Sequence, residues 1–343
     1  MRKLLNTLYI TNPNAYLSKD GENIVVKIDD EEIGRRPIHI LEGVVCFNFN
    51  GMSPALMKLC GQHGVTVSFL SQYGNFLGRV QGEVNGNVLL RRTQYRIADD
   101  DEKSLDISRN FIIGKVVNGR KVLNRALRDH NNVVNNDLLL EIQEKMSNSI
   151  NKIMNCCSSD ELRGIEGEVS RAYFQGINEL ILHQKEVFFF KERSRRPPRD
   201  NLNALLSYAY TLITYEMSSA LETVGLDPYV GFFHTDRPGR VSLALDMIEE
   251  LRSYVADRFV LSLINRRQIN EDGFVPKENG GILMKDETKR TFLSSWQKRK
   301  QDIIEHPFIH ERIEFGLIPY VQACLMARYI RGDIEAYPPF FVS

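Results

Sequence analysis

The chain has 343 residues, which is enough for two domains of ordinary size, each with its own hydrophobic core. Its 43% apolar and 26% charged residues are typical of a soluble globular protein and exclude a disordered chain. Lys plus Arg and Asp plus Glu both number 44, so the net charge is zero. This balance argues against a uniformly basic nucleic-acid coat protein, but it leaves room for local basic patches.

Membrane insertion and secretion are not indicated by the sequence. No uninterrupted run of about 18 apolar residues occurs, so no membrane span is expected. The N-terminal residues lack the long apolar stretch and cleavage site of a signal peptide. The five cysteines form no CxxC pair, which indicates neither a disulfide framework nor a zinc knuckle. We therefore expect a cytoplasmic protein with reduced thiols.

The first hundred residues have the pattern of β-strands. A helix is expected over residues 53–63, with Ser53 as its N-cap and Pro54 at its first position. A charged linker is expected at 98–105, after an N-terminal β domain over residues 1–97. Runs of β-branched and aromatic residues, separated by turn-forming residues, predict strands over 4–10, 15–17, 23–28, 38–47, 65–70 and 77–80.

From residue 106 the apolar residues recur with the 3.6-residue period of helices. Long loops are expected over residues 191–199, which are basic and contain prolines, and over the glycine-containing segment 266–282. The predicted fold is therefore α+β, a small β-strand domain followed by an all-α-helical domain over residues 106–343. Helices are expected across 106–130, 137–156, 159–183, 203–223, 242–265, 284–304 and 312–331.

One carboxylate interrupts the apolar stripe of the helix expected at 159–183. At about 100° per residue, Glu166 falls between Leu162 and Tyr173, whereas Glu168 falls on the opposite, solvated side. A carboxylate among packed side chains must be paired, protonated or bound to a cation. The pattern is typical both of a ligand site and of a structural ion pair with an arginine of another helix.

A second polar cluster lies within residues 230–252. An apolar run ends at His234, and the helix that follows carries Asp246, Glu249 and Glu250 on one face. An acidic stripe alone is typical of a solvated surface. Together with the first cluster, it offers two or three carboxylates and one imidazole, which suit Mg²⁺ or Mn²⁺ better than Zn²⁺. Such an ion polarises a phosphodiester and stabilises the attacking or leaving oxygen of a displacement.

Both clusters resemble a known family, the CRISPR-associated integrase-nuclease called CRISPR-associated protein one. The resemblance rests on the segments GIEGEVSRAYF and GFFHTDRPGRVSLALDMIEELR. It continues through ENGGILMKDETKRTFLSSWQKRK to the closing ARYIRGDIEAYPPF, and these last two segments are similar to the subtype I-C branch. The likeness covers essentially the whole chain in the expected order.

The resemblance implies catalytic and metal-binding roles for Glu166, His234 and Glu249, with Asp246 as a further acid at the metal. Glu250 remains an alternative to Glu249 at the last position. The implied cofactor is Mg²⁺ or Mn²⁺, and the implied activity is that of a DNA endonuclease and integrase. In this reaction the 3′-hydroxyl of captured foreign DNA attacks a phosphodiester at the CRISPR repeat, and the fragment becomes a new spacer for antiviral defence.

The resemblance also implies several partners. The DNA partners are a double-stranded protospacer and the CRISPR repeat. The N-terminal β domain is implied to form a homodimer, which assembles with a dimer of CRISPR-associated protein two. The nuclease CRISPR-associated protein four is implied to join the complex and trim the captured DNA. All of these partners belong to the prokaryotic cytoplasm.

A long polyanion needs basic residues along its path. Arg237 and Arg240, close to His234 in sequence, are candidates for a phosphate clamp. Further candidates for contacts to the DNA backbone are Lys191, Arg193, Arg195, Arg196, Arg199, Lys298, Arg299 and Lys300. Two other functions stay open: a helical DNA-binding scaffold without catalysis, in which the acids are structural, and a metal-dependent hydrolase of small phosphoesters.

Two other motifs do not support a site of their own. His306 and His310 have the i, i+4 spacing of a helical metal site, but Pro307 stands where HExxH has its general-base glutamate. A structural role is therefore expected for both histidines. The segment GKVVNG at 114–119 resembles a P-loop, but it lacks the Lys and Ser/Thr that would follow.

Overall fold

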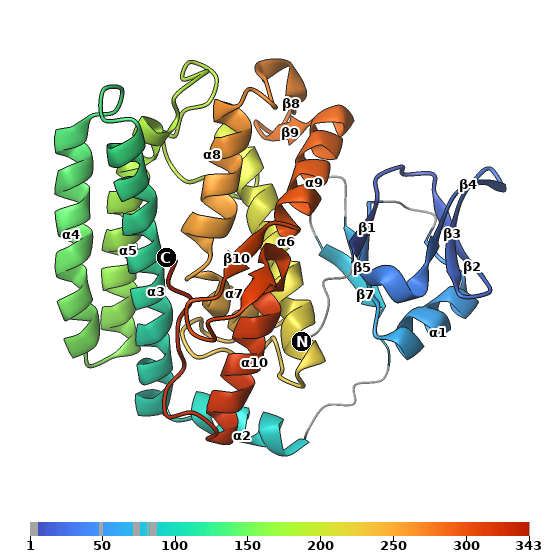
Figure 1. Cartoon of the computed structure of the whole chain (residues 1–343), viewed down its shortest axis with the longest axis horizontal. Helices are drawn as coiled ribbons and strands as arrows, with labels where there is room; N and C mark the ends of the chain where they lie inside the picture. Colours follow the sequence, from blue (N-terminus) through green and yellow to red (C-terminus); the bar gives the residue numbers. More distant parts are fainter. Residues whose placement is uncertain (1–5, 48–50, 71–75, 81, 83–87, 343) are drawn as a thin grey trace. The chain divides into compact units, whose positions relative to one another are not determined.

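The computed structural model describes the whole chain except residues 1–5, 48–50, 71–75, 81, 83–87 and 343. Its contacts divide the chain into two compact units (Figure 1). Unit 1 contains Met1–Asn85, Lys289–Ile303 and Glu314–Leu317, and unit 2 contains Gly86–Thr288, Ile304–Ile313 and Ile318–Ser343. These units differ from the expected domains because two short segments from the C-terminal part of the sequence group with the N-terminal residues.

Unit 1 contains two small sheets and a helix, α1 (Pro54–His63). The expected helix cap is present, since the amide of Leu56 donates to Ser53 Oγ at 3.3 Å. The mixed sheet has β1 (Asn6–Ile10), β5 (Leu41–Cys46), β6 (Thr66–Leu70) and β7 (Phe76–Val80), and the antiparallel sheet has β2 (Tyr16–Asp20), β3 (Asn23–Ile28) and β4 (Glu31–Pro37).

The sequence did not predict β4. Its residues, EEIGRRP, lack the alternation of apolar and polar side chains that marks a half-buried strand. Arg35 of this strand forms ion pairs with Asp20 at 2.6 Å and with Glu32 at 2.9 Å. The strand is therefore defined by its backbone pairing with β3, which a search for apolar alternation does not detect. The first two residues of the strand expected at 4–10 lie outside the described residues.

Unit 2 is mostly helical, as expected, but it is not wholly so. It contains the paired strands β8 (Phe274–Pro276) and β9 (Ile282–Met284), and most of the paired strands β10 (Ile303–Glu305) and β11 (Arg312–Glu314). Its helices are α2 (Val88–Ala98), α3 (Asp101–Asp129), α4 (Asn136–Asn155), α5 (Ser159–Gly176), α6 (Asn201–Thr223), α7 (Ser242–Ile248), α8 (Arg258–Asn265) and α10 (Ile318–Arg331), while most of α9 (Asp286–Lys300) belongs to unit 1.

The segment 98–105, expected as a linker, is mainly helical. Helix α2 ends at Ala98 and α3 begins at Asp101. Asp100 is the N-cap of α3, because its side chain accepts a hydrogen bond from the amide of Lys103 at 3.1 Å. Acidic residues in a first helical turn also interact favourably with the positive end of the helix dipole. The charged segment is thus the start of a helix. Its composition alone does not distinguish the start of a helix from a linker.

Three helices of unit 2, α3, α4 and α5, pack side by side (Figure 1). Helix α6 packs against α7, α10 and a π-helical turn at Arg252–Asp257, which interrupts the helix expected over 242–265. This turn also contacts α3. Helix α3 therefore packs against α5 and also against α7 and the π-helical turn. None of the described helices has the length and apolar character required to cross a membrane.

Candidate active site in the helical unit

Two glutamates from distant parts of the chain share one ammonium group. Glu166 lies on α5, and Glu249 is the C-terminal cap of α7. Lys115 of α3 donates from Nζ to Glu166 Oε1 and, at 2.9 Å, to Glu249 Oε2. The hydroxyl of Ser170 also donates to Glu166 Oε1, at 2.7 Å. The fold therefore brings the carboxylates of Glu166 and Glu249 to the same cation.

Glu249 remains charged although it is buried. Its side chain is 3% exposed, and Arg252 binds its other oxygen, Oε1, at 2.9 Å. Burial acts to raise the pKa of Glu249, but Arg252, Lys115 and His234 outweigh that effect and lower the pKa to about 2. The carboxylate is thus an anion at neutral pH, and His234 lies near enough to affect its charge.

His234 is held by Asp246, which lies on α7 and is fully buried. Asp246 Oδ1 contacts His234 Nδ1 at 2.6 Å and accepts from the His234 amide at 2.9 Å. Its Oδ2 accepts from the amides of Phe232 and Phe233 at 2.7 and 3.0 Å. Asp246 therefore fixes both the backbone before α7 and the imidazole ring, and Nε2 is the ring nitrogen that can meet a ligand.

The four ligands expected for a metal ion do not form one group. Among the described residues, no cluster of three or more His, Cys, Asp or Glu side chains has an arrangement that could hold a metal ion. Glu166 and Glu249 meet at Lys115, whereas both oxygens of Asp246 are engaged by amides and by His234. Two carboxylates that already converge on a cation fit a divalent ion at the place of the ammonium group.

Glu250, the alternative to Glu249, faces a different set of partners. Its Oε1 accepts from Tyr337 Oη at 2.6 Å and from Gln322 Nε2 at 2.9 Å, and its Oε2 accepts from the amide of Phe340 at 2.8 Å. Burial raises the pKa of Glu250 to about 7, although these donors act to lower it. Of the two neighbours, Glu249 is the one that shares a cation with Glu166.

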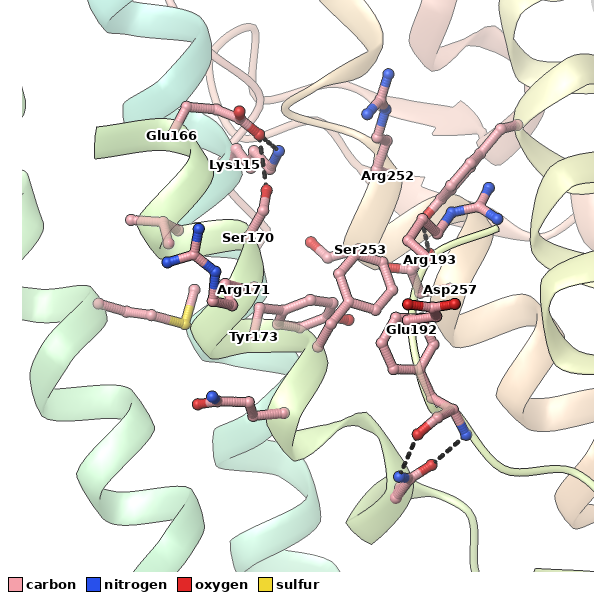
Figure 2. Close-up of a pocket in the computed structure, with 18 of the residues that line it drawn as sticks. Lys115, Glu166, Ser170, Arg171, Tyr173, Glu192, Arg193, Arg252, Ser253 and Asp257 are labelled. Atoms are coloured by element: carbon pink, nitrogen blue, oxygen red, sulfur yellow. Dashed lines mark hydrogen bonds and ion pairs between the residues drawn. The ribbon is translucent and has the colours of Figure 1, made fainter. Parts of the chain in front are cut away.

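A cavity of about 530 Å³ opens beside Glu166 (Figure 2). Glu166, Lys115 and Ser170 lie on one side of it. The other side carries polar side chains from the 191–195 loop and from the π-helical turn, among them Arg193, Arg252 and Asp257. The lining also includes four aromatic side chains, Tyr173, Phe174, Phe190 and Tyr210.

The aromatic and charged groups of this cavity are tied together. The guanidinium groups of Arg193 and Arg252 lie 5.4 and 5.3 Å from the centre of the Tyr210 ring. Tyr210 Oη donates to Asp257 Oδ1 at 2.5 Å. Burial raises the pKa of Asp257 to about 6, against the effect of Tyr210, Tyr173 and both arginines. The cavity wall thus combines ring faces with positively charged groups, which suits an unstacked nucleotide.

Several of the predicted DNA-binding residues lie close to this site. Arg195 lines the cavity, Arg237 is exposed and Arg240 is half-buried in the segment after His234. Burial lowers the pKa of Arg240, and the charges of Arg237, Arg195 and Arg252 lower it further. Guanidinium groups that repel one another in this way form a local positive patch, which attracts a polyanion.

The remaining predicted basic residues are distributed differently. Arg196 and Arg199 are exposed in the loop before α6, and Lys298 is exposed on α9 within unit 1. Lys300 is buried and donates to Thr7 Oγ1 at 3.3 Å, so the prediction that it follows a DNA backbone is wrong. The group of basic residues therefore does not form one continuous track within a single unit.

His306 has a structural role, as expected. It is fully buried, its Nε2 contacts Gln322 Oε1 at 3.1 Å, and burial lowers its pKa to about 4. The segment between β10 and β11 is not a helix, so the i, i+4 spacing of His306 and His310 does not place them on one helical face, and His310, for which a structural role was also expected, is exposed. Trp296 is likewise a core residue, stacked near Phe292.

Lys115 and Arg252 were missed from the sequence. Lys115 falls between Phe111 and Gly119, on the side of α3 that carries buried residues. A charged residue in an apolar stripe is the same pattern that drew attention to Glu166. Arg252 lies three residues after Glu249, the spacing of an ion pair on a helix. Both patterns were visible in the sequence, but neither reveals which partner folding will provide.

The fold and the site together define a two-unit protein whose helical unit collects two carboxylates, a lysine and several arginines beside a cavity. A family model described as CRISPR associated protein Cas1 matches residues 8–298. The chain belongs to this family. It is 49% identical to the CRISPR-associated endonuclease Cas1 1 of Chlorobaculum tepidum over 340 residues, which cover 99% of each chain. It is 48% identical over 345 residues to CRISPR-associated endonuclease Cas1 2 of Rhodospirillum rubrum, again with 99% of each chain covered.

Other similar proteins are parts of larger chains or complexes. A Cas4 exonuclease/Cas1 endonuclease fusion of Geobacter sulfurreducens is 34% identical over 97% of this chain and 60% of its own length. A casposase solved with an integration product has the same fold, with a TM-score of 0.86, 21% identity and coverage of 99% and 95%. A chain of a Cas6-RT-Cas1–Cas2 complex has a TM-score of 0.81 and 22% identity, over 99% of this chain and 36% of that one.

Proposed function

We propose that the protein is a CRISPR adaptation endonuclease and integrase, which cuts and joins DNA at the site of Glu166 and Glu249. The observation that carries this proposal is the convergence of these two carboxylates on one cation. The curated relatives that are nearly half identical to this chain are named CRISPR-associated endonucleases. A site of anions and cations beside a positive patch suits the handling of phosphodiesters.

Mg²⁺ or Mn²⁺ is the cofactor that we propose for this site. Glu166 and Glu249 would hold it, the Nε2 atom of His234 would join them when the ion binds, and Asp246 would orient His234 without binding the ion. When bound, such an ion polarises the phosphodiester and stabilises charge on the reacting oxygens. The convergence of two carboxylates on an ammonium group supports a cation position here.

The protein's own residues have distinct tasks in this proposal. Arg237 and Arg240 hold the phosphate of the target strand, while Arg252 keeps Glu249 in place through the contact at 2.9 Å. The aromatic cavity receives the end of the incoming strand. The 3′-hydroxyl of that strand loses its proton as its oxygen bonds to phosphorus. The phosphodiester bond of the target breaks, and the leaving oxygen stays on the displaced strand and takes up a proton. With water as the nucleophile, the same site nicks DNA.

We also propose the assembly and setting that the family suggests. Unit 1 would form the homodimer, which would bind a Cas2 dimer and work with a Cas4 nuclease in a prokaryotic cytoplasm. The Geobacter relative, in which Cas4 and Cas1 are fused, supports the Cas4 partner. The name of the similar Cas6-RT-Cas1–Cas2 complex is in line with the Cas2 partner. The closing sequence ARYIRGDIEAYPPF suggests the subtype I-C branch.

A pair of variants on one helix tests the proposed function. Glu166→Gln removes the charge at the site, whereas Glu168→Gln removes a charge two residues away on the exposed side of α5. Strand transfer on a branched DNA substrate with Mn²⁺ should fall at least about 100-fold in the first variant, as for the loss of a group that stabilises charge in the transition state. It should remain normal in the second. Equal rates for wild type and Glu166→Gln would reject the assignment.

The same assay separates the two rival functions. A DNA-binding scaffold would retain DNA without any turnover. A hydrolase of small phosphoesters would cleave a chromogenic phosphodiester at a rate independent of DNA length. For the integrase, His234→Ala should impair strand transfer and leave DNA affinity nearly unchanged, as measured by fluorescence anisotropy.

A further inference from the structure

Lys115 occupies the centre of the proposed metal site. Its side chain is 14% exposed, and its ammonium group contacts one oxygen of Glu166 and one of Glu249. Lys115 thus links the two glutamates through its ammonium group. Without a cation between them, two carboxylates close enough to share one ammonium group would repel each other strongly in a largely buried environment. Lys115 is therefore what keeps the pair together in the structure.

The charges around Lys115 balance. Glu166 and Glu249 contribute two negative charges, and Lys115 and Arg252 contribute two positive charges. A divalent ion added to this set would leave two excess positive charges in a place where Glu249 is only 3% exposed. The ion would also need the carboxylate oxygens that the ammonium group now contacts. Binding of the ion is thus favoured when one of the resident cations moves away.

Of the two resident cations, Lys115 is the one suited to move. Arg252 binds Glu249 Oε1, and its guanidinium lies 5.3 Å from the centre of the Tyr210 ring. Arg252 therefore loses two kinds of contact if it leaves. Lys115 carries a compact charge on a flexible four-carbon chain, and it can turn without changing the course of α3. Its ammonium group lies beside the cavity that borders Glu166.

We propose that Lys115 is a placeholder cation, which holds Glu166 and Glu249 together before a divalent ion binds and then gives way to it. This inference rests on the proposed function, because it concerns the same site. Lys115 is a positioning residue in the free protein. Once displaced, its ammonium group is available to pair with the negative charge of a DNA phosphate.

The test is the affinity of the protein for Mn²⁺ in the absence of DNA, measured by titration calorimetry. Lys115→Gln removes the competing charge but retains a side chain that can donate to one carboxylate. Its Kd for Mn²⁺ should be at least about tenfold lower than that of wild type. The matched control is Lys103→Gln on the same helix, where an exposed lysine pairs with Asp100 at 2.6 Å. The control should leave the Kd unchanged.

A second readout is thermal stability. In EDTA, Lys115→Gln should melt below wild type because the two carboxylates lose their shared partner, and Mn²⁺ should raise its Tm more than it raises that of wild type. If the Gln variant does not fold, Lys115→Met, which keeps the aliphatic part of the side chain, takes its place in both measurements.

The outcomes separate this inference from the proposed function. If wild type binds Mn²⁺, and the folded variant binds it equally or more weakly, Lys115 is not a placeholder, and the metal site stands. If wild type and all folded variants fail to bind Mn²⁺, the metal site and the placeholder both fall. A tighter Kd in the Lys115 variant, together with an unchanged Kd for Lys103→Gln, supports the placeholder.

Discussion

Two neighbouring regions of unit 2 use the same residue type in opposite ways. The carboxylate site, formed by Glu166, Glu249, Lys115 and Arg252, surrounds its glutamates with cations. The region around Glu250, which we call the C-terminal clasp, surrounds a glutamate with neutral donors from α10 and the last residues of the chain. Both glutamates are buried, yet the pKa falls to about 2 for Glu249 and rises to about 7 for Glu250. Burial alone therefore does not decide the charge of a carboxyl group, because its partners do.

Helix α3 serves both regions from adjacent turns. Lys115 faces the carboxylate site, and Asn118 faces the clasp. Asn118 Nδ2 donates to the carbonyls of Glu250 and Phe340, both at 2.7 Å, and Asn118 Oδ1 accepts from the amide of Val342 at 2.9 Å. The clasp thus fixes the backbone immediately after Glu249 through hydrogen bonds of a neutral side chain. The cationic groups belong to the carboxylate site.

The largest expected effect comes from exchanging each glutamate for its neutral analogue. Glu249→Gln should lower strand transfer at least about 100-fold, because the site loses a charged ligand. Glu250→Gln should retain most of the activity, since the single oxygen of glutamine can still accept from Tyr337 and Gln322, and only the amide of Phe340 loses its acceptor. Rates on a branched DNA substrate measure both variants. Equal losses of strand-transfer rate in the two variants would show that the two regions do not differ in function.

The clasp should matter for stability. Asn118→Ala leaves two buried carbonyls and one amide without their present partner, which should cost about 2–4 kcal/mol in the free energy of unfolding. Asn155→Ala is the matched control, because Asn155 is exposed and donates to the carbonyl of Asn151 within its own helix. Urea denaturation measures both. A loss in Asn118→Ala no greater than in the control would mean that the clasp does not hold the fold.

The two glutamates should give opposite pH dependences of stability. The raised pKa of Glu250 means that its protonated form stabilises the fold fully below pH 4.5, a contribution lost as the pH rises towards 7. The lowered pKa of Glu249 means that its contribution is present above pH 4.5 and lost as the pH falls towards 2.

The expected size of the Glu250 effect is roughly 3 kcal/mol across its pH window, at 1.36 kcal/mol per pKa unit. Chemical denaturation of wild type and Glu250→Gln between pH 4.5 and 7 measures it as a change in the difference between their unfolding free energies. Wild type should lose stability relative to the variant as the pH rises. A constant difference would show that Glu250 titrates as an ordinary glutamate.

The smallest expected effect concerns DNA binding. Arg237→Ala on the exposed segment after His234 should reduce the slope of log K against log salt by about 1, the effect of one lost phosphate contact. Arg331→Ala, on the helix that carries Gln322 of the clasp, removes an arginine paired with Asp333 at 2.9 Å and should leave the slope unchanged. Equal slopes for both variants would remove Arg237 from the DNA path.

Sequence patterns predicted the elements that depend on local order. The strand at 23–28, the helix start at Ser53 and the helix over 137–156 were expected within a residue or two of their observed bounds. Helical periodicity and helix caps involve residues at most a few positions apart, so both can be recognised in the sequence. The charged segment 98–105 was misjudged because acidic residues occur both in linkers and in first helical turns.

The sequence by itself determined the order of strands and helices, the family, and the presence of a carboxylate within an apolar stripe at Glu166. Only the tertiary structure decided its partners. Lys115 lies 51 residues from Glu166 and 134 residues from Glu249. Which of Glu249 and Glu250 faces Lys115 depends on how α3 packs against the segment after α7. The physical reason is that the energy of an ion pair depends on the distance between its charges in space. The packing of helices sets that distance, and no pattern in the sequence of one chain reports it.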